Sequence, residues 1–411
     1  MAGAGAKLFT SGSVLTADQV NTFLMDQSIM RFASTTARDA AFGGAGEPTL
    51  SEGMFAYTTD TNTLWLYNGS SWVNLLGSDI GEQALSNRNV IINGAMQIAQ
   101  RGTSVASITT RDYYTVDRFA FGPSTMGTWT MSVENDAPTG SGFRKSAKML
   151  CTTADASPAA NDFVRIDTSF EGQNLQQFLK GTSSAKGFSL SFWVKSNVTG
   201  TYIVNLYDVD NTRSVSGSYT ISASATWEKK TITFPADTTG AFDNDNNQSA
   251  LLIFGLGSGS TLASGTLNTT WESAVNANRF AGQTNVAATL NNYWQVTGVQ
   301  LEAGAVATPF EFEDYGVTLA KCQRYFCSHA VVGVDAYAGA GQNVVGRVTY
   351  PVAMRALPTL TLGTLIAQSN NSTAITFDAA ISSILSGALV TSAASTARTF
   401  VYYALTASIE L

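Results

Sequence analysis

Short runs in which apolar and polar residues alternate recur along most of this sequence, and turn-forming residues separate them. In the run FSLSFWVK, which begins at Phe188, every second residue is apolar, and Ser, Ser, Trp and Lys lie between them. This period of two places one set of side chains on each face of a β-strand. The later runs YIVNLY, SYTIS, KTITF, LLIF and YWQVTGVQL follow clusters of Gly, Asn, Asp and Ser. Many short strands over about 200 residues predict a mainly β protein with a central jelly-roll β-sandwich.

A glycine interrupts the last of these runs. Gly298 follows Trp294 and Val296, and it precedes Val299 and Leu301. A β-bulge at the glycine would add one residue to the strand and return the later pair to the face of the earlier pair. The sequence therefore predicts a bulge at Gly298.

The regions before and after the sandwich have other patterns, so we divide the chain into residues 1–80, 81–312 and 313–411. In the first region, a capping box predicts a helix over 16–31, and the runs MFAYT, LWLY and SWVNL predict a small antiparallel meander. Both elements are too small to bury much core, so they need a partner surface. The last region predicts one or two helical turns near 317–325, followed by a distal C-terminal β domain.

The charge content limits the possible partners. The chain of 411 residues has only 13% charged residues and a net charge of −7, against about 25% charged residues in an average soluble protein. No basic excess exists to bind nucleic acid or an anionic membrane surface. No apolar run of signal-peptide or membrane-spanning length is found, so we expect synthesis in the cytosol and no membrane insertion. Uncharged polar residues or other copies of the chain must cover the surface.

Few residues are suited to metal or nucleophilic chemistry. His329 is the single histidine, and Cys151, Cys322 and Cys327 are the only cysteines. Zinc sites and most nucleophile–base pairs use histidine, and three cysteines do not form a disulfide framework in a long chain. We predict free thiols, no catalytic residues and no metal or other cofactor.

Acidic residues leave two alternatives open. Asp243, Asp245 and Asn247 imitate the first positions of a calcium loop, and the pair at 208 and 210 offers further oxygen ligands. A structural Ca²⁺ at these residues is therefore an alternative to a solvated loop. Glycoside hydrolysis needs two facing carboxylates. The pairs at 208/210 and 311/314 are examples of candidates, although chance pairs are expected among 30 acidic residues.

Aromatic residues in polar surroundings are the more informative group. Rings flanked by amides, hydroxyls and carboxylates suit sugars, because a sugar's C–H face stacks on a ring while its hydroxyls need hydrogen-bond partners. Packing in a core or in an interface between subunits is the alternative. The glycan-binding candidates are Trp193, Tyr207, Trp227, Trp271 and, in an expected distal loop at 335–343, Tyr337.

Several segments, taken in order, resemble the tail-fibre proteins of tailed bacteriophages. They are GMFAYTTDTNTLWLYNGSSWV, NVIINGAMQIAQRGTS, YTVDRF, YWQVTGVQLEAGAVATPFE, and LAKCQRYF with TYPVAMRALPTLTLG. The second to fourth are similar to the parts of a receptor-binding fibre whose jelly-roll resembles carbohydrate-binding modules. The resemblance implies a homotrimeric virion protein that attaches to other virion proteins through its N-terminal region and faces the host with the rest.

The leading hypothesis is a non-enzymatic phage fibre that adheres to host surface polysaccharide, with its main contact in the distal domain. One alternative is a purely structural head or neck fibre or a connector. The second alternative is a polysaccharide depolymerase, which would need carboxylates grouped in a groove.

Overall fold

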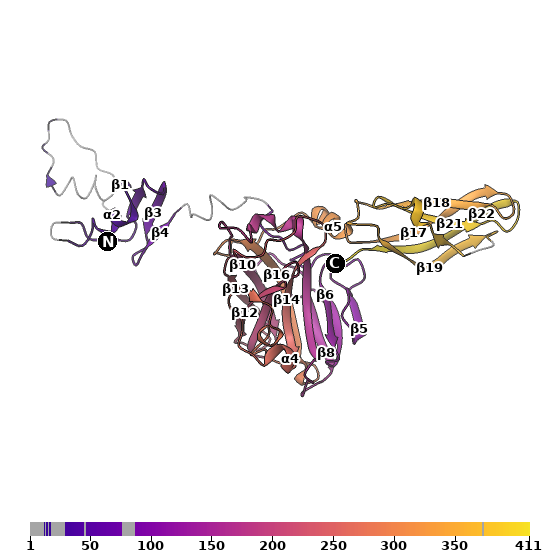
Figure 1. Ribbon diagram of the computed structural model, residues 1–411, viewed down its shortest axis with the longest axis horizontal. Helices are drawn as coiled ribbons and strands as arrows, with labels where there is room; N and C mark the ends of the chain where they lie inside the picture. The colour runs from indigo at the N-terminus through magenta and orange to yellow at the C-terminus, as the bar shows by residue number, and fades with distance from the viewer. Residues whose placement is uncertain are drawn as a thin grey trace. The chain divides into compact units, whose positions relative to one another are not determined.

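The computed structural model describes residues 12, 14, 16, 17, 29–44, 47–75, 87–371 and 374–411. The chain divides into two compact units, Met1–Ser86 and Asn87–Leu411. Both units are built from β-sheets, and Figure 1 labels many of their strands. The protein is therefore mainly β, with β-sandwich architecture, as the alternating pattern predicts. Among the described residues, no helix has the length and apolar character to cross a membrane.

The first unit holds a four-stranded sheet in the order β1-β2-β3-β4. Its strands are β1 (Ile29–Phe32), β2 (Phe55–Thr58), β3 (Thr63–Tyr67) and β4 (Trp72–Asn74). The predicted meander forms β2 to β4, and α2 (Thr35–Asp39) follows β1. Arg38 of α2 is only 5% exposed, and its guanidinium carbon lies 4.6 and 4.9 Å from the ring centroids of Trp65 and Trp72.

The prediction of a helix over 16–31 is wrong at its C-terminal end. Ile29, Met30 and Arg31 belong to β1, which pairs in parallel with β2. Along β1, exposed residues alternate with half-buried ones, which is the periodicity of a strand. Pairing with a distant segment stabilises this strand. Residues 18–28 of the predicted helix lie outside the described residues.

The central sandwich consists of two six-stranded sheets. The first sheet has the order β13 (Glu228–Phe234), β10 (Phe188–Ser196), β16 (Tyr293–Ala303), β8 (Ser146–Thr153), β7 (Thr128–Glu134) and β5 (Ser104–Ile108). The second has the order β15 (Glu272–Ser273), β12 (Arg213–Ile221), β11 (Gly200–Asp208), β14 (Gln248–Ser258), β9 (Phe163–Glu171) and β6 (Ala120–Ser124). Side chains from both sheets form one hydrophobic core. Short helical turns are η2 (Gly172–Asn174), η3 (Gln176–Phe178), α4 (Ser260–Ala263), η4 (Asn276–Asn278) and η5 (Val286–Ala288).

The bulge predicted at Gly298 is confirmed. Gly298 has a φ of +63°, and the register between β10 and β16 shifts at this point. A side chain here would also collide with the Phe143 ring, 2.5 Å from the position of a Cβ. The residues that the bulge was expected to align all lie in the sandwich core, namely Trp294, Val296, Val299 and Leu301.

The C-terminal domain begins with α5 (Tyr315–Gln323), where helical turns were predicted. Two three-stranded sheets follow. One has the order β17 (Phe326–Ala338), β22 (Ala397–Ser408) and β19 (Thr359–Ser369), and the other β18 (Asn343–Thr349), β21 (Ser386–Ser392) and β20 (Thr376–Phe377), with the turn η6 (Ala379–Ile381). They enclose a second, smaller core.

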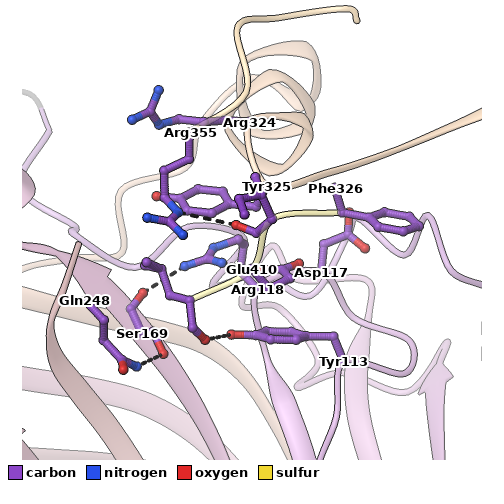
Figure 2. A network of polar contacts seen from close by, with 12 residues as sticks. Tyr113, Asp117, Arg118, Ser169, Gln248, Arg324, Tyr325, Phe326, Arg355 and Glu410 are labelled. Carbon is purple, nitrogen blue, oxygen red and sulfur yellow. Dashed lines mark hydrogen bonds and ion pairs between the residues drawn. The ribbon is translucent and has the colours of Figure 1, made fainter. Parts of the chain in front are cut away.

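Ion pairs join this domain to the sandwich, and Figure 2 shows the surroundings of Arg118 and Glu410. Arg118, which is 1% exposed, pairs with Glu410 near the end of the chain. Arg101 binds the same carboxylate at 2.9 Å. Arg324, directly after α5, binds Glu171 of β9 at 2.9 Å. The last residues of the chain therefore belong to the folding unit of the sandwich.

Candidate functional site

Two of the predicted glycan-binding tryptophans share the outer face of the first sheet. Trp193 lies in β10 between Lys229 of β13 and Thr297 of β16. Its neighbours Phe192 and Val194 are fully buried in the core, so the Trp193 side chain points to the opposite face, where it is partly exposed. This is the placement that the alternating pattern predicted.

Trp227, directly before β13, lies on the same face and is tied to a carboxylate. Its indole N–H donates to Asp136 at 3.0 Å, and Lys195 binds the same carboxylate at 2.8 Å. The Lys195 ammonium also lies 5.9 Å from the Trp227 ring centroid. We call Trp193, Lys195, Trp227, Lys229 and Asp136 the β10 platform.

The electrostatics of the β10 platform keep its carboxylate charged. Burial raises the pKa of Asp136, but hydrogen bonds from Lys195 and Trp227 outweigh burial, and the pKa lies below its usual range. The surface therefore offers two partly exposed indole rings, two ammonium groups and one carboxylate. Ring faces can stack on sugar C–H faces, while the charged groups donate to and accept from hydroxyls.

Trp271 has a packing role. Its ring lies 5.8 Å from that of Phe188 and packs against the sandwich core, and its N–H donates to the carbonyl of Pro235 at 2.9 Å. Tyr207 lies on the outer face of the second sheet, under the guanidinium of Arg279, whose carbon is 4.5 Å from the ring centroid. The structure therefore separates these two rings from the β10 platform.

Tyr337 lies in the C-terminal domain and is 75% exposed. Residues 335–338 belong to β17 rather than to a loop, and the turn to β18 covers only 339–342. Pairing with β22, in which Tyr337 is opposite Arg398, extends the strand beyond the predicted boundary. Tyr337 is thus an exposed ring on a strand, in a different sheet from the sandwich candidates.

The structure contains a cleft of about 710 Å³ that the sequence did not predict. Residues 87–92, the turns η2 and η3, and α5 with the residues after it line the cleft. Six of its lining side chains are amides, namely Asn87, Asn89, Gln173, Asn174, Gln176 and Gln177, and the cations Lys321 and Arg324 also line it. In the sequence, only the run GQNLQQ at 172–177 indicates a concentration of amides. The fold brings this run close to the other amides of the cleft.

Glu171 lies beside this amide cleft. It accepts from Arg324 at 3.0 and 2.9 Å and from the Tyr325 hydroxyl at 2.6 Å. Burial raises the pKa of Glu171, but these hydrogen bonds outweigh burial and lower the pKa. The Glu171 carboxylate is thus ionised, and Arg324 and Tyr325 already bind its oxygens. The cleft therefore presents amide and cationic groups to a ligand.

The carboxylates considered for calcium or hydrolysis have separate partners. Asp208 is buried and binds Lys180 at 2.5 Å, whereas Asp210 is exposed and accepts from the Asp243 N–H at 2.9 Å. Glu311 accepts from the Asn89 N–H, and Asp314 caps α5. The structure therefore does not place the two carboxylates of either pair, 208/210 or 311/314, around a common ligand.

The three cysteines are free and buried, as predicted. The Sγ atom of Cys327 lies 3.7 Å from Nε2 of His329. In the part of the chain that the structure describes, no group of three or more His, Cys, Asp or Glu side chains gathers as metal ligands would.

The sequence matches no protein-family model and no curated protein. Among solved structures, the chain is similar to the enzymatically active domain of tailspike protein 4 from bacteriophage CBA120, with 14% identity, a TM-score of 0.28, and coverage of 53% of this chain and 21% of that one. A family 11 carbohydrate-binding module from Clostridium thermocellum has 13% identity, a TM-score of 0.25, and coverage of 50% and 99%. A family 4 carbohydrate-binding module has 11% identity, a TM-score of 0.26, and coverage of 51% and 97%. These similarities are too low to assign a function, which must come from the chain's own residues.

Proposed function

We propose that this protein is a non-enzymatic fibre subunit of a phage virion that adheres to host surface polysaccharide through the β10 platform. The observation that carries the proposal is that Trp193 and Trp227 lie on one outer sheet face with charged partners beside both rings. Trp193 and Trp227 share one sheet face, whereas Tyr337 is the single predicted candidate in the C-terminal domain. The proposed main contact is therefore in the sandwich rather than in the distal domain.

The motifs of the sequence support the virion part of the proposal, and the separate N-terminal unit fits an attachment role. Three buried carboxylates of the sandwich support the non-enzymatic part. Asp167, Glu171 and Asp208 are fully buried and each is bound to arginine or lysine, so none is placed as a general acid or base. A structural fibre without adhesive function and a depolymerase are the alternatives that the tests below address.

Replacing Trp193 with Ala should weaken glycan binding about 30-fold or more. Truncating a central aromatic contact costs about 2 kcal/mol or more, and 1.4 kcal/mol is tenfold in affinity. Fluorescent wild-type and variant proteins should be compared on an array of bacterial surface polysaccharides. Tyr337→Ala is the matched control and should retain wild-type binding.

Loss of binding with Tyr337→Ala but not with Trp193→Ala would move the contact to the distal domain. If the wild-type protein bound no polysaccharide of the array or of its host, the structural alternative would be favoured. Release of reducing ends from the bound polysaccharide would establish the depolymerase instead.

The purified protein should be a trimer with three times the chain mass of 43.4 kDa. Large apolar side chains are exposed in the C-terminal domain, including Val331 at 60% and Leu385 at 58%, and contacts between copies would cover them. Three linked sites could raise the avidity for a repeating glycan by about 10²–10⁴. Light scattering at micromolar concentration measures the mass, and a stable monomer would contradict the fibre proposal.

A further inference from the structure

Three arginines lie on the outer face of the second sheet, and two of them bind the same carboxylate. Asp167 of β9 is fully buried. It accepts from Arg111 at 2.8 and 2.5 Å and pairs with Arg165 of the same strand at 3.0 Å. The side chains of Arg111 and Arg165 remain 30% and 27% exposed. One carboxylate therefore serves two partly accessible guanidinium groups.

Among the described residues, the third arginine has no acidic partner. Arg279, directly after η4, donates through Nε and Nη2 to the amide oxygen of Asn205, at 3.1 and 2.8 Å. Its guanidinium covers the ring of Tyr207. Asn205 of β11 and Asp167 of β9 both pair with Ile253 of the strand between them, so they lie in one row across the sheet. The charge of Arg279 is thus balanced by a neutral amide and a ring alone.

The cluster carries an uncompensated positive charge at a partly buried position. Burial is the main cause that lowers the pKa of Arg279 to about 10; Tyr207 partly opposes this shift, and the charge of Arg165 adds to it. Burial also lowers the pKa of Arg165, and Arg111 acts in the same direction. All three groups remain charged at neutral pH, in a protein whose net charge is −7. Holding these cations together costs free energy that a bound anion would recover.

We propose that Arg111, Arg165 and Arg279 form a second binding site, which takes the carboxylate of an acidic sugar in the host polysaccharide. A guanidinium group offers parallel N–H donors that match the two oxygens of a carboxylate. The Tyr207 ring stacks against the Arg279 guanidinium and supports its position. This inference rests on the proposed glycan-binding function, but it uses a different sheet and different residues from the β10 platform.

Isothermal titration of the full-length protein with tetragalacturonate tests the proposal, with neutral galactotetraose at the same ionic strength as the comparison. Wild-type protein should bind the acidic tetrasaccharide more tightly, and Arg279→Gln should lower that affinity about tenfold or more. Arg144→Gln removes one exposed positive charge next to β8 of the other sheet and should change that preference little. Arg279→Gln should remain folded but unfold at a lower temperature than the wild type, because the buried Asn205 oxygen loses both hydrogen bonds from Arg279; calorimetry measures the difference.

Several outcomes would overturn the proposal. They are no binding of tetragalacturonate, equal binding of the neutral probe, and equal losses of affinity in Arg279→Gln and Arg144→Gln. The last outcome would indicate unspecific charge attraction. Tighter binding of oligothymidylate of equal charge would assign the cluster to phosphate groups. If Trp193→Ala lost binding on the polysaccharide array while Arg279→Gln did not change the titration, this inference would fail and the proposed adhesion would stand. The reverse result would retain the arginine site and remove the β10 platform.

Discussion

Replacing Lys180 with Met is expected to destabilise the second unit by about 3–5 kcal/mol, because removing one partner of a buried ion pair leaves the other charge uncompensated. The Lys180 side chain is 0% exposed and binds two carboxylates, Asp208 at 2.5 Å and Asp237 at 3.1 Å. Its ammonium also donates to the backbone carbonyls of Thr239 and Gly240. Methionine fills a similar volume but provides none of these hydrogen bonds.

Calorimetric unfolding of the full chain measures the loss, and Lys229→Met is the control, since Lys229 is exposed and should change stability by less than about 1 kcal/mol.

The stability should also depend on acid pH. Burial raises the pKa of Asp237, but hydrogen bonds from Arg213, the Thr239 N–H and Lys180 outweigh burial and lower it. The stabilising contribution of Asp237 is therefore complete above the usual aspartate pKa of about 3.9 and is lost as the pH falls through the lower folded-state value. Equal stability of Lys180→Met and wild type would show that the pair is not buried as described.

The second large effect is expected at the end of the chain, where Glu410→Ala should cost about 3–5 kcal/mol. This substitution removes the carboxylate that pairs with buried Arg118 and with Arg101. The Arg118 guanidinium would keep its bond to the Ser169 carbonyl at 2.9 Å and its position 3.5 Å from the Tyr325 ring centroid, but its charge would have no acidic partner. Figure 2 shows how these groups join the sandwich to the last residues.

Glu313→Ala provides the matched control, because Glu313 pairs with Lys321 at a position where both side chains are partly exposed. Such a surface pair contributes about 0–1 kcal/mol. A variant with both Arg118→Met and Glu410→Leu should be more stable than Glu410→Ala, since removing both charges leaves neither uncompensated. If Glu410→Ala and Glu313→Ala had equally small effects, the C-terminal residues would not be part of the folding unit.

The sequence alone determined the elements whose signals are local. Alternation of apolar and polar residues located β10 and the face of Trp193, because the period of a strand is a property of the strand itself. Gly298 revealed its bulge because the apolar pattern changes phase at that residue. The start of α5 was also readable from its spacing of apolar residues.

Only the tertiary structure decided which side chains share a site. Residues 29–31 become a strand because β2, more than 20 positions later, supplies their backbone partners. Asp208, a candidate calcium ligand by its spacing, receives the ammonium of Lys180 from a segment 28 residues earlier. The arginine cluster combines residues from position 111 to position 279, and no local pattern marks them. Long-range pairing sets these neighbours, because the free energy of burying a charge depends on which charges the fold places beside it.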